Sequence, residues 1–418
     1  MIIQGFIKQF FRLGFTSLCI IMSMLFCTLE TTAQQFKFNR NRKKQTISFQ
    51  LIKNLIVIPV YINGEGPYNF LLDTGVAQTI ITDTTLLKNL NVLRFHPVKV
   101  QGYGFGEEVE AIFTRDINIG VGSATILNVP TAIFKKDIFD LSSYLGIKIH
   151  GIIGYYFFNS FIVKINYFSS KLTIYDPETN VKIKGSKIPM EIANGKPYIK
   201  AAISINDLNN EVIELMVDNG SSHPMLLESL DQKAFPLPAA TISANLGVGI
   251  NGVISGAMGR VNILKIADFT FKEVLSGFPD FNALRASIEG QARNGSLGAD
   301  VMRRFLVTFD YQHGFMYLKK GSFFKDSFEH DMSGLEIYVK QENKPRFYIG
   351  RIEEGSPGDH AGLEVNDEIV SIDFRETRIY TLSDVNELLK SRDGKQVLLE
   401  IIRKNERYYV LLVLKRRI

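Results

Sequence analysis

Cysteine is almost absent from this 418-residue sequence, and its scarcity excludes several kinds of site. Cys19 and Cys27 are the two cysteines, and both lie in the N-terminal segment. If that segment is removed, the remaining chain has no thiol for a disulfide, a zinc–cysteine site or a cysteine nucleophile. Histidine is also scarce, and the six histidines lack the close spacings typical of metal ligands, so we expect no metal and no cofactor.

Long apolar runs are lacking except at the N-terminus. Lys8 and Arg12 precede an apolar stretch over about 13–27, and the segment "TLETTA" after it ends in a small residue, Ala33. This order is typical of a cleaved secretory signal, so we predict a signal peptide over residues 1–33 and a periplasmic or secreted protein. The run is shorter than the roughly 18 residues of a membrane span, which makes an uncleaved membrane anchor the less favoured alternative.

Neither sign of charge predominates. The formal net charge is +5 at pH 7, and it becomes +4 if residues 1–33 are removed. So small an excess gives no basis for a nucleic-acid partner. The one basic cluster, "KFNRNRKK", follows the predicted cleavage site. We expect residues 34–45 to be a solvated, disordered basic leader, and any membrane contact to come only through the N-terminal segment.

One segment of the sequence occurs twice. "GIIGYYFFNSFIVKINYFSSKLTIYDP" begins at Gly151, and "GSLGADVMRRFLVTFDYQHGFMYLKKG" begins 144 residues later at Gly295. An internal repeat predicts two similar structural units. The two copies match at these pairs of positions: Gly154 with Gly298, Phe161 with Phe305, Val163 with Val307, and Tyr167 with Tyr311.

The repeat also identifies a pair of acids. "FLLDTGVAQTII" places Asp73 at the end of an apolar run, and "IELMVDNGSSHPMLL" places Asp218 in the matching position 145 residues on. The upstream segments agree as well, "VIPVYIN" with "KAAISIN". We therefore expect Asp73 and Asp218 to occupy equivalent positions in two lobes.

The pattern within both copies indicates β-structure. Short alternating segments rich in Val, Ile, Phe and Tyr are separated by Gly and Asn, which is typical of strands joined by turns. Helical patterns are few and short, at "TTLLKNL" and "FNALRASIEG". We predict a mainly β fold, with lobe one over residues 46–180 and lobe two over residues 185–322.

Residues 333–418 have a different pattern. Two strands, a Gly/Pro turn and a short helix ending near Gly362 are followed by "TLSDVNELLK", whose apolar residues have helical spacing. Thr381 and Asp384 form a capping pattern at the start of that helix. "QVLLEIIRKNERYYVLLVLK" then predicts a hairpin, so this region is an α+β domain of its own.

Two carboxyl groups held close together suit one reaction, the attack of water on an amide. Neighbouring carboxylates cannot both ionise, so they share one proton. The ionised acid takes a proton from the attacking water, while the protonated acid polarises the carbonyl. Gly75 and Gly220, two residues after each acid, allow a sharp turn and supply amide N–H groups to the carboxylates.

These motifs resemble those of retropepsin-like aspartic peptidases, the known example of a shared-proton dyad. The likeness is to the bacterial single-chain kind, which has two lobes and a C-terminal PDZ domain. It rests on Asp73-Thr74-Gly75, on Asp218-Asn219-Gly220, and on the apolar-apolar-Gly elements ending at Gly154 and Gly298. The resemblance implies two lobes of the closed β-barrel type with one catalytic Asp each, Asp73 and Asp218, and bridging residues at 74 and 219.

The resemblance also implies that glycine-rich hairpins cover the substrate. "VQGYGFGEEVE", residues 100–110, fits the first such flap, with Tyr103 as the expected substrate contact. "LGVGINGVISGAMG", residues 246–259, fits the second.

Two departures from the family pattern bear on activity. Asn219 stands where the family has Thr or Ser, and Val76 stands where a small or hydroxylic residue is usual, whereas Ser221 holds that place in lobe two. A Ser221 hydroxyl bonded to Asp218 would favour its charged form. We therefore expect Asp218 to be ionised and Asp73 protonated, and Ser221→Ala to move the acid limb of the pH–rate profile to higher pH.

Residues 333–418 resemble a PDZ domain of the protease-associated type. "GSPGDHAGLEVNDEIVSID" matches its core, and "TLSDVNELL" matches the helix that lines the peptide groove. Such domains add an extended peptide as a strand and hold its terminal carboxylate with backbone N–H groups. The residues matching that carboxylate-binding loop are Gly334, Leu335, Glu336 and Ile337. A PDZ fold used only for packing against the lobes is the alternative.

The sequence thus predicts an exported aspartic endopeptidase that acts on peptide or protein substrates and binds C-terminal peptides at its PDZ groove. One alternative is a homologue with impaired catalysis that binds peptides in the same cleft, because Asn219 departs from the family pattern. The other is a PDZ-centred interaction scaffold.

Overall fold

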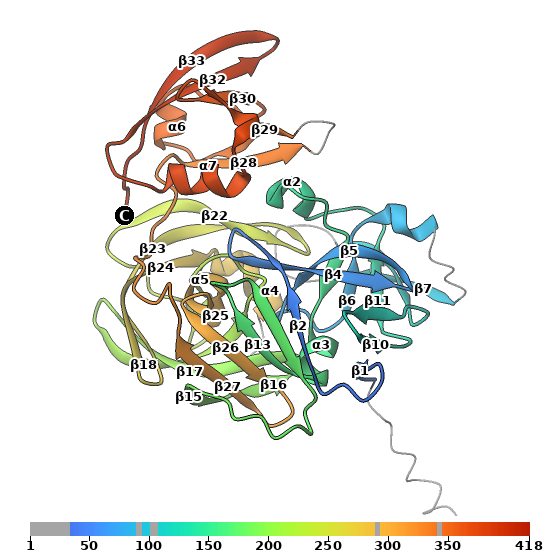
Figure 1. The fold of residues 1–418 in the computed structure, drawn as a ribbon. Helices are drawn as coiled ribbons and strands as arrows, with labels where there is room; N and C mark the ends of the chain where they lie inside the picture. The colour runs from blue at the N-terminus through green and yellow to red at the C-terminus, as the bar shows by residue number, and fades with distance from the viewer. Residues whose placement is uncertain (1–33, 89–93, 101–107, 289–292, 341–344) are drawn as a thin grey trace, which may run out of the picture. The chain divides into compact units, whose positions relative to one another are not determined.

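The computed structural model describes residues 34–88, 94–100, 108–288, 293–340 and 345–418 (Figure 1). Within these residues the chain is mainly β, which confirms the predicted fold class. Residues 35–418 form one compact unit. Tyr103, the expected flap contact, lies outside the described residues.

Lobe one is built on one sheet of eleven described strands. β4 and β5 form a hairpin whose inward residues are buried, and β5 leads directly to Asp73. The strands of this sheet are β1 (Lys37–Phe38), β3 (Gln50–Ile52), β4 (Leu55–Ile62), β5 (Glu65–Leu72), β6 (Thr79–Ile81), β7 (Phe95–Val100), β8 (Val109–Thr114), β9 (Ile119–Val121), β10 (Ala124–Ile126), β11 (Thr131–Phe134) and β12 (Gly151–Ile153).

Lobe two repeats this plan with a sheet of eight described strands. β18 takes the place of β5 and ends at Asp218, while β25 takes the place of β12. Its strands are β16 (Glu191–Ala193), β17 (Lys196–Ile205), β18 (Leu208–Asp218), β19 (Met225–Leu227), β22 (Thr241–Gly249), β23 (Gly252–Ile266), β24 (Phe269–Pro279) and β25 (Gly295–Gly298); β20 (Ser229–Leu230) and β21 (Lys233–Ala234) form a separate pair.

A third sheet joins the two lobes. The repeat copies pair with each other in it, because β13 runs antiparallel to β26 with Val163 opposite Phe309 and Ile165 opposite Val307. All four of these side chains are buried, and one continuous apolar core extends through both lobes. The strands of this sheet are β2 (Lys44–Ser48), β13 (Ile162–Asn166), β14 (Lys171–Tyr175), β15 (Ser186–Pro189), β26 (Phe305–Asp310) and β27 (Phe315–Lys320).

The basic leader, residues 34–45, is ordered, so the expectation of a disordered segment was wrong. Phe36 is buried, its ring packs edge-on to Phe157 at 5.7 Å, and its amide donates to Ser160 Oγ at 2.8 Å. β1 pairs with β10 beside it. Phe36 and the half-buried Phe38 account for this, since the apolar surface that they remove from water offsets the entropy lost on ordering the segment.

The helices are few and short, as the sequence predicts. The segment "FNALRASIEG" forms α4, whereas "TTLLKNL" forms only a 3₁₀ turn, η1. α2 and α3 were not predicted, because each spans little more than one turn and shows no helical periodicity. The bounds are η1 (Thr84–Lys88), α2 (Leu141–Leu145), α3 (Tyr155–Ser160), α4 (Phe281–Ile288) and α5 (Ala299–Met302).

The C-terminal region has its own sheet and core. The predicted helix with its Thr381–Asp384 capping box is confirmed as α7, and the predicted last hairpin is confirmed as β32–β33. The elements are β28 (Leu335–Lys340), β29 (Arg346–Ile352), α6 (Pro357–His360), β30 (Glu368–Ile372), β31 (Arg375–Glu376), η2 (Thr377–Ile379), α7 (Leu382–Leu389), β32 (Gln396–Arg403) and β33 (Glu406–Val413).

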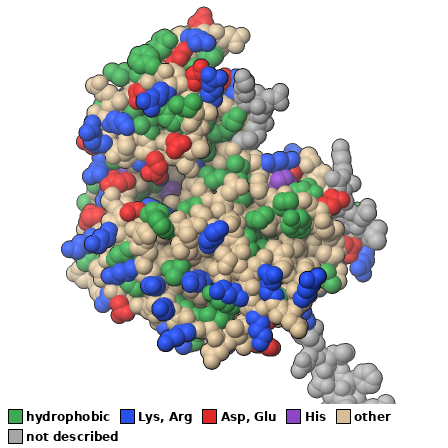
Figure 2. Space-filling model, viewed as in Figure 1, with side chains coloured by type: hydrophobic (Ala, Val, Ile, Leu, Met, Phe, Trp, Pro, Cys, Tyr) green, Lys and Arg blue, Asp and Glu red, His purple; other side chains and the backbone are tan. Residues whose placement is uncertain are grey.

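Charge is mixed over the molecular surface. On the face shown in Figure 2, Lys and Arg side chains lie interspersed with acidic, hydrophobic and uncharged ones. Through the described ranges, no helix is both long enough and apolar enough to cross a membrane. Nor does any group of three His, Cys, Asp or Glu side chains in those ranges have the placement to hold a metal ion.

Candidate active site

The two acids stand where two buried strands end. In lobe one β12 lies parallel to β5, with Ile153 opposite Leu72, and the Asp73 amide donates to the Ile153 carbonyl at 2.9 Å. In lobe two β25 lies parallel to β18, with Gly298 opposite Asp218. The apolar-apolar-Gly elements of the repeat therefore support the ends of the acid-bearing strands.

The residues after the acids bind the two lobes together. The Thr74 amide donates to Asn219 Oδ1 at 2.7 Å. The Thr74 hydroxyl accepts from the Asn219 amide at 3.0 Å and donates to the Val217 carbonyl at 2.7 Å. Thr74 and Asn219 have no exposed surface, so these bonds form away from water and hold the two loops in register.

Asn219 leaves one donor without a partner. The asparagine oxygen and amide serve the cross-lobe bonds, but its side-chain Nδ2 is buried and makes no hydrogen bond to any described residue. A buried donor left unsatisfied costs about 1–3 kcal/mol. Asn219 therefore makes the hydrogen bonds between the lobes, but its unpaired donor lowers the stability of this bridge.

Replacing Asn219 with Thr is expected to raise the free energy of unfolding by about 1 kcal/mol, because a hydroxyl keeps an acceptor for Thr74 and removes the unpaired amide N–H. Urea unfolding of wild type and variant measures the change. Asn219→Ala, which removes the acceptor as well, should destabilise the protein. A lower stability for Asn219→Thr than for wild type would contradict the interpretation.

The Asp73 and Asp218 carboxyl groups meet at the interface of the lobes. Gly75 donates its amide to Asp73 Oδ1 at 2.7 Å, and Gly220 donates its amide to Asp218 Oδ1 at 3.0 Å. The two carboxyl groups lie close together, because a Cβ atom on Gly75 would lie 3.0 Å from Asp218 Oδ1 and 3.1 Å from Asp73 Oδ1. A Cβ atom on Gly220 would lie 2.2 Å from Asp73 Oδ2, so only glycine allows this approach.

Burial changes the acidity of both carboxyl groups. It raises the pKa of Asp73 well above its usual value, and the negative charge of Asp218 raises it further. Burial also raises the pKa of Asp218, and the Gly220 amide opposes that rise. The pair therefore holds a proton at a pH where an exposed Asp is ionised, and the assignment of that proton to Asp73 stays a prediction from the sequence.

The prediction that Asp218 is the ionised acid depended on a hydroxyl contact from Ser221, and the structure does not show that contact. Among the described residues, the Asp218 carboxylate accepts from the Gly220 amide and has no bond from the Ser221 hydroxyl. The Ser221 backbone amide contributes instead. A change to alanine keeps that amide, so the structure removes the basis for expecting Ser221→Ala to move the acid limb.

The second predicted flap, residues 246–259, lies in the hairpin of β22 and β23. Its turn falls between Gly249 and Gly252. At the base of the hairpin the Asn245 side chain accepts from the Gly247 amide at 3.1 Å.

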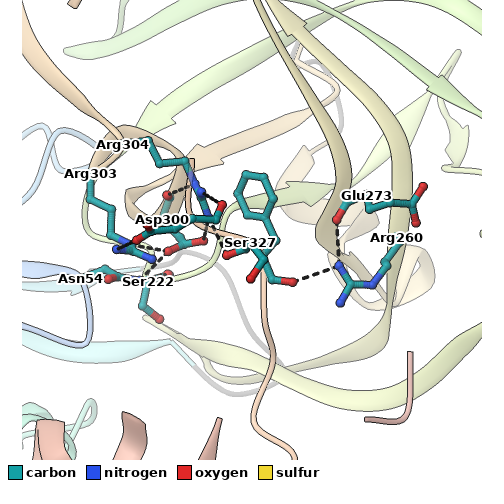
Figure 3. Close-up of polar contacts among 10 residues, drawn as sticks. Asn54, Ser222, Arg260, Glu273, Asp300, Arg303, Arg304 and Ser327 are labelled. Carbon is teal, nitrogen blue, oxygen red and sulfur yellow. Dashed lines mark hydrogen bonds and ion pairs between the residues drawn. The ribbon is translucent and has the colours of Figure 1, made fainter. Parts of the chain in front are cut away.

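Sequence reasoning missed a contact to the loop that follows Asp218. Asn54, in the turn between β3 and β4, donates its side-chain amide to the Ser222 carbonyl at 3.2 Å and to Asp300 Oδ1 at 3.3 Å (Figure 3). Both residues of this turn, Lys53 and Asn54, have positive φ. A "KN" pair between two apolar runs is the sequence signal for such a turn, but it does not indicate what the turn contacts.

The predicted carboxylate-binding loop of the C-terminal domain contains a residue that was also missed. The Asp331 carboxylate accepts from the Ser333 amide at 2.9 Å and from the Gly334 amide at 2.7 Å. Leu335 and Ile337 are buried, while Glu336 is half-buried. An Asp two residues before a Ser or Gly is a common local capping pattern, and this was the available signal.

Two models of known protein families match this chain, one in lobe one and one in the C-terminal domain. Residues 58–157 match the model of an aspartyl protease family, and residues 348–403 match that of the PDZ domain, so the chain combines an aspartyl protease segment with a PDZ domain. The first match includes Asp73 but ends before Asp218, and the second begins after Ile337.

A comparison of folds found many solved structures that are similar to this chain, whereas a search of curated protein sequences found no match. One of these structures is the aspartic proteinase of Irpex lacteus, at 13% sequence identity and a TM-score of 0.41, and the similarity covers 68% of this chain and 99% of that one.

Proposed function

We propose that this protein is an exported aspartic endopeptidase in which Asp73 and Asp218 form the catalytic dyad. The observation that carries the proposal is the close pair of carboxyl groups held by two equivalent loops, one from each lobe. The cross-lobe bonds of Thr74 and Asn219 support it, because they fix the separation of the acids before substrate arrives.

The geometry suits general acid–base catalysis. Ionised Asp218 takes a proton from a water molecule, whose oxygen attacks the peptide carbonyl carbon. Asp73 gives its proton to the carbonyl oxygen, and a tetrahedral gem-diol forms. Its collapse breaks the C–N bond as Asp218 returns the proton to the leaving nitrogen, and Asp73 recovers its own proton from the gem-diol hydroxyl.

The PDZ domain provides a second peptide site in this proposal. An extended peptide adds to the free edge of β28 and directs its terminal carboxylate to the loop of Gly334 to Ile337, as PDZ domains bind their ligands. The apolar side chains Leu335 and Ile337 favour a ligand that ends in an apolar residue.

The raised pKa of Asp73 predicts how activity and the free energy of unfolding change with pH. Burial and the charge of Asp218 raise the pKa of Asp73 above the ordinary 3.8, so activity should persist well above pH 4 and fall when the shared proton is lost. In the same window the folded state holds a proton that the unfolded chain has released. The free energy of unfolding should therefore fall as pH rises through the window.

A pH–rate profile on a peptide substrate and urea unfolding at several pH values measure these two effects. Asp73→Asn, which cannot titrate, should lose the dependence of stability on pH in that window. An alkaline limb near pH 4 would contradict the raised pKa of Asp73.

The test of the proposed function is hydrolysis of a peptide library by wild type, Asp73→Ala and Asp218→Ala. Cleavage by wild type alone supports the dyad, whereas equal cleavage by all three refutes it. Binding without cleavage by all three would favour the peptide-binding alternative. N-terminal sequencing of protein recovered outside the cytoplasm tests export, and a mature chain beginning after Ala33 is the expected result.

A further inference from the structure

The peptide-binding edge of the PDZ sheet is already in contact with lobe one. Among the described strands, β28 is terminal in its sheet and pairs with β29 alone, so its other edge is the one to which a peptide would add. Lys53, from the β3–β4 turn, donates its ammonium group to the Ile337 carbonyl on β28 at 3.4 Å. One of the backbone groups that a bound peptide would use is therefore occupied.

Aromatic side chains hold Lys53 in this position. Its Nζ lies 3.7 Å from the centre of the Tyr144 ring of lobe one and 5.8 Å from that of Tyr338 on β28. The two rings pack edge to face at 5.9 Å. The Lys53 ammonium group thus lies near one aromatic ring from each domain. This cation–π contact is specific, because it requires both the positive charge and the two rings.

Lobe one also enters the groove between β28 and α7. Gly146 follows α2, and a Cβ atom on it would lie 3.3 Å from Val339 Cγ2 on β28 and 3.4 Å from Leu382 Cδ2 on α7. These two side chains belong to the strand and the helix that form the walls of the groove. The end of α2 therefore lies where side chains of a bound peptide would pack.

The carboxylate-binding loop is occupied as well. Asp331 accepts from the amides of Ser333 and Gly334, so an internal carboxylate takes backbone donors at this loop. Glu336, which the structure places on β28 directly after this loop, accepts from the Asn245 side chain at the base of the lobe-two hairpin at 3.2 Å. A ligand carboxylate would meet two acidic side chains here, and it would have to displace Asp331 from the amides.

We infer that the peptide-binding face of the PDZ domain is docked on the chain's own lobes through Lys53, Tyr144, Gly146 and Asn245, and that a peptide binds there only by displacing them. The ligand class is an extended peptide with apolar side chains, because the groove walls at Val339 and Leu382 are apolar. Docking and peptide binding are mutually exclusive, since both use the β28 edge and the groove.

A consequence for activity rests on the proposed function. Asn54, next to Lys53, donates its side-chain amide to the Ser222 carbonyl. Ser222 lies four residues after Asp218, so the docked turn supports the loop of a catalytic acid. Displacing the docked contacts loosens this turn, and a groove-bound peptide should lower kcat.

The first test is a disulfide in the full chain with Cys19 and Cys27 replaced by serine. Gly146→Cys with Val339→Cys should cross-link, because a Cβ atom on Gly146 would lie 3.5 Å from the Val339 Cβ, within disulfide range. Mass spectrometry after mild oxidation measures the loss of two hydrogens. Gly146→Cys with Tyr409→Cys is the control, since Tyr409 is on β33, at the other end of the PDZ sheet. Cross-linking no faster than in this control would overturn the docking.

The second test measures competition with fluorescein-labelled octapeptides that have free carboxyl termini ending in Val, Leu or Phe. By fluorescence anisotropy, Lys53→Ala with Tyr144→Ala should bind them at least about tenfold more tightly than wild type does, and the disulfide-linked chain should not bind them. Lys171→Ala with Tyr175→Ala, which changes the same residue types on β14, should behave as wild type. Equal affinity for wild type and linked chain would overturn the competition, and so would a lack of binding to the Lys53/Tyr144 variant.

Neither readout depends on hydrolysis, so the two proposals can fail separately. If the groove is docked and competes with peptides, but Asp73→Ala and wild type cleave alike, only the proposed protease function is refuted. If cleavage depends on the dyad, but the Gly146/Val339 cysteine pair does not cross-link, only the docking is refuted.

Discussion

Asp218→Asn is expected to lower kcat for peptide hydrolysis by about 10³-fold, with little change in KM. In the proposed mechanism Asp218 is the ionised member of the pair, so its carboxylate is the base that takes a proton from water. An amide cannot take that proton, and general acid–base catalysis contributes about 10²–10⁴-fold. Because the proton moves only on the way to the transition state, the loss should fall on kcat.

Asp73→Asn should cause a similar loss for a different reason. An amide can still donate a hydrogen bond to the substrate carbonyl, but it cannot transfer a proton to it. Steady-state kinetics on a peptide from the library screen measures both variants. Asp268→Asn, an exposed acid bonded to Ser186, is the control and should keep wild-type rates. Residual activity above about a tenth of wild type in either dyad variant would contradict the assigned roles.

Arg293→Met is expected to reduce the free energy of unfolding by about 3–5 kcal/mol, the largest effect on stability that we predict. Arg293 Nε lies 3.0 Å from Glu228 Oε2, and the two side chains are only 1% and 3% exposed. Arg293 also donates to the sulfur of Met216 at 3.0 Å. Removing the guanidinium leaves a carboxyl group buried without its cation, and the cost of that burial accounts for the effect.

The double variant Glu228→Leu with Arg293→Met distinguishes the cost of an unpaired charge from the loss of packing. It should recover most of the stability, because replacing both buried charges by apolar groups is often neutral. Arg407→Met, which breaks the exposed pair with Glu400, should change stability by at most about 1 kcal/mol. Chemical denaturation measures all three. A double variant as unstable as Arg293→Met alone would contradict the electrostatic explanation.

The acids were predictable because the repeat carries them in the chain itself. Asp73 and Asp218 follow equivalent apolar strands, and two such strands in equivalent lobes end at the same interface. Which of the two acids carries the proton stays a prediction from the sequence. The hydroxyl of Ser221, on which that prediction depended, does not bond to Asp218 in the described residues, whereas the amides of Gly75 and Gly220 bond to the two acids.

The sequence by itself determined the mainly β lobes, the paired acids with their glycines, and the C-terminal helix with its capping box, since each depends on residues close together in the chain or on the repeat. Only the tertiary structure decided what Asn219 bonds to, that Phe36 anchors the leader, and that Lys53 and Gly146 lie against the PDZ groove. Those contacts join residues far apart in sequence, and local patterns of hydrophobicity and turn residues carry no information on which surfaces meet.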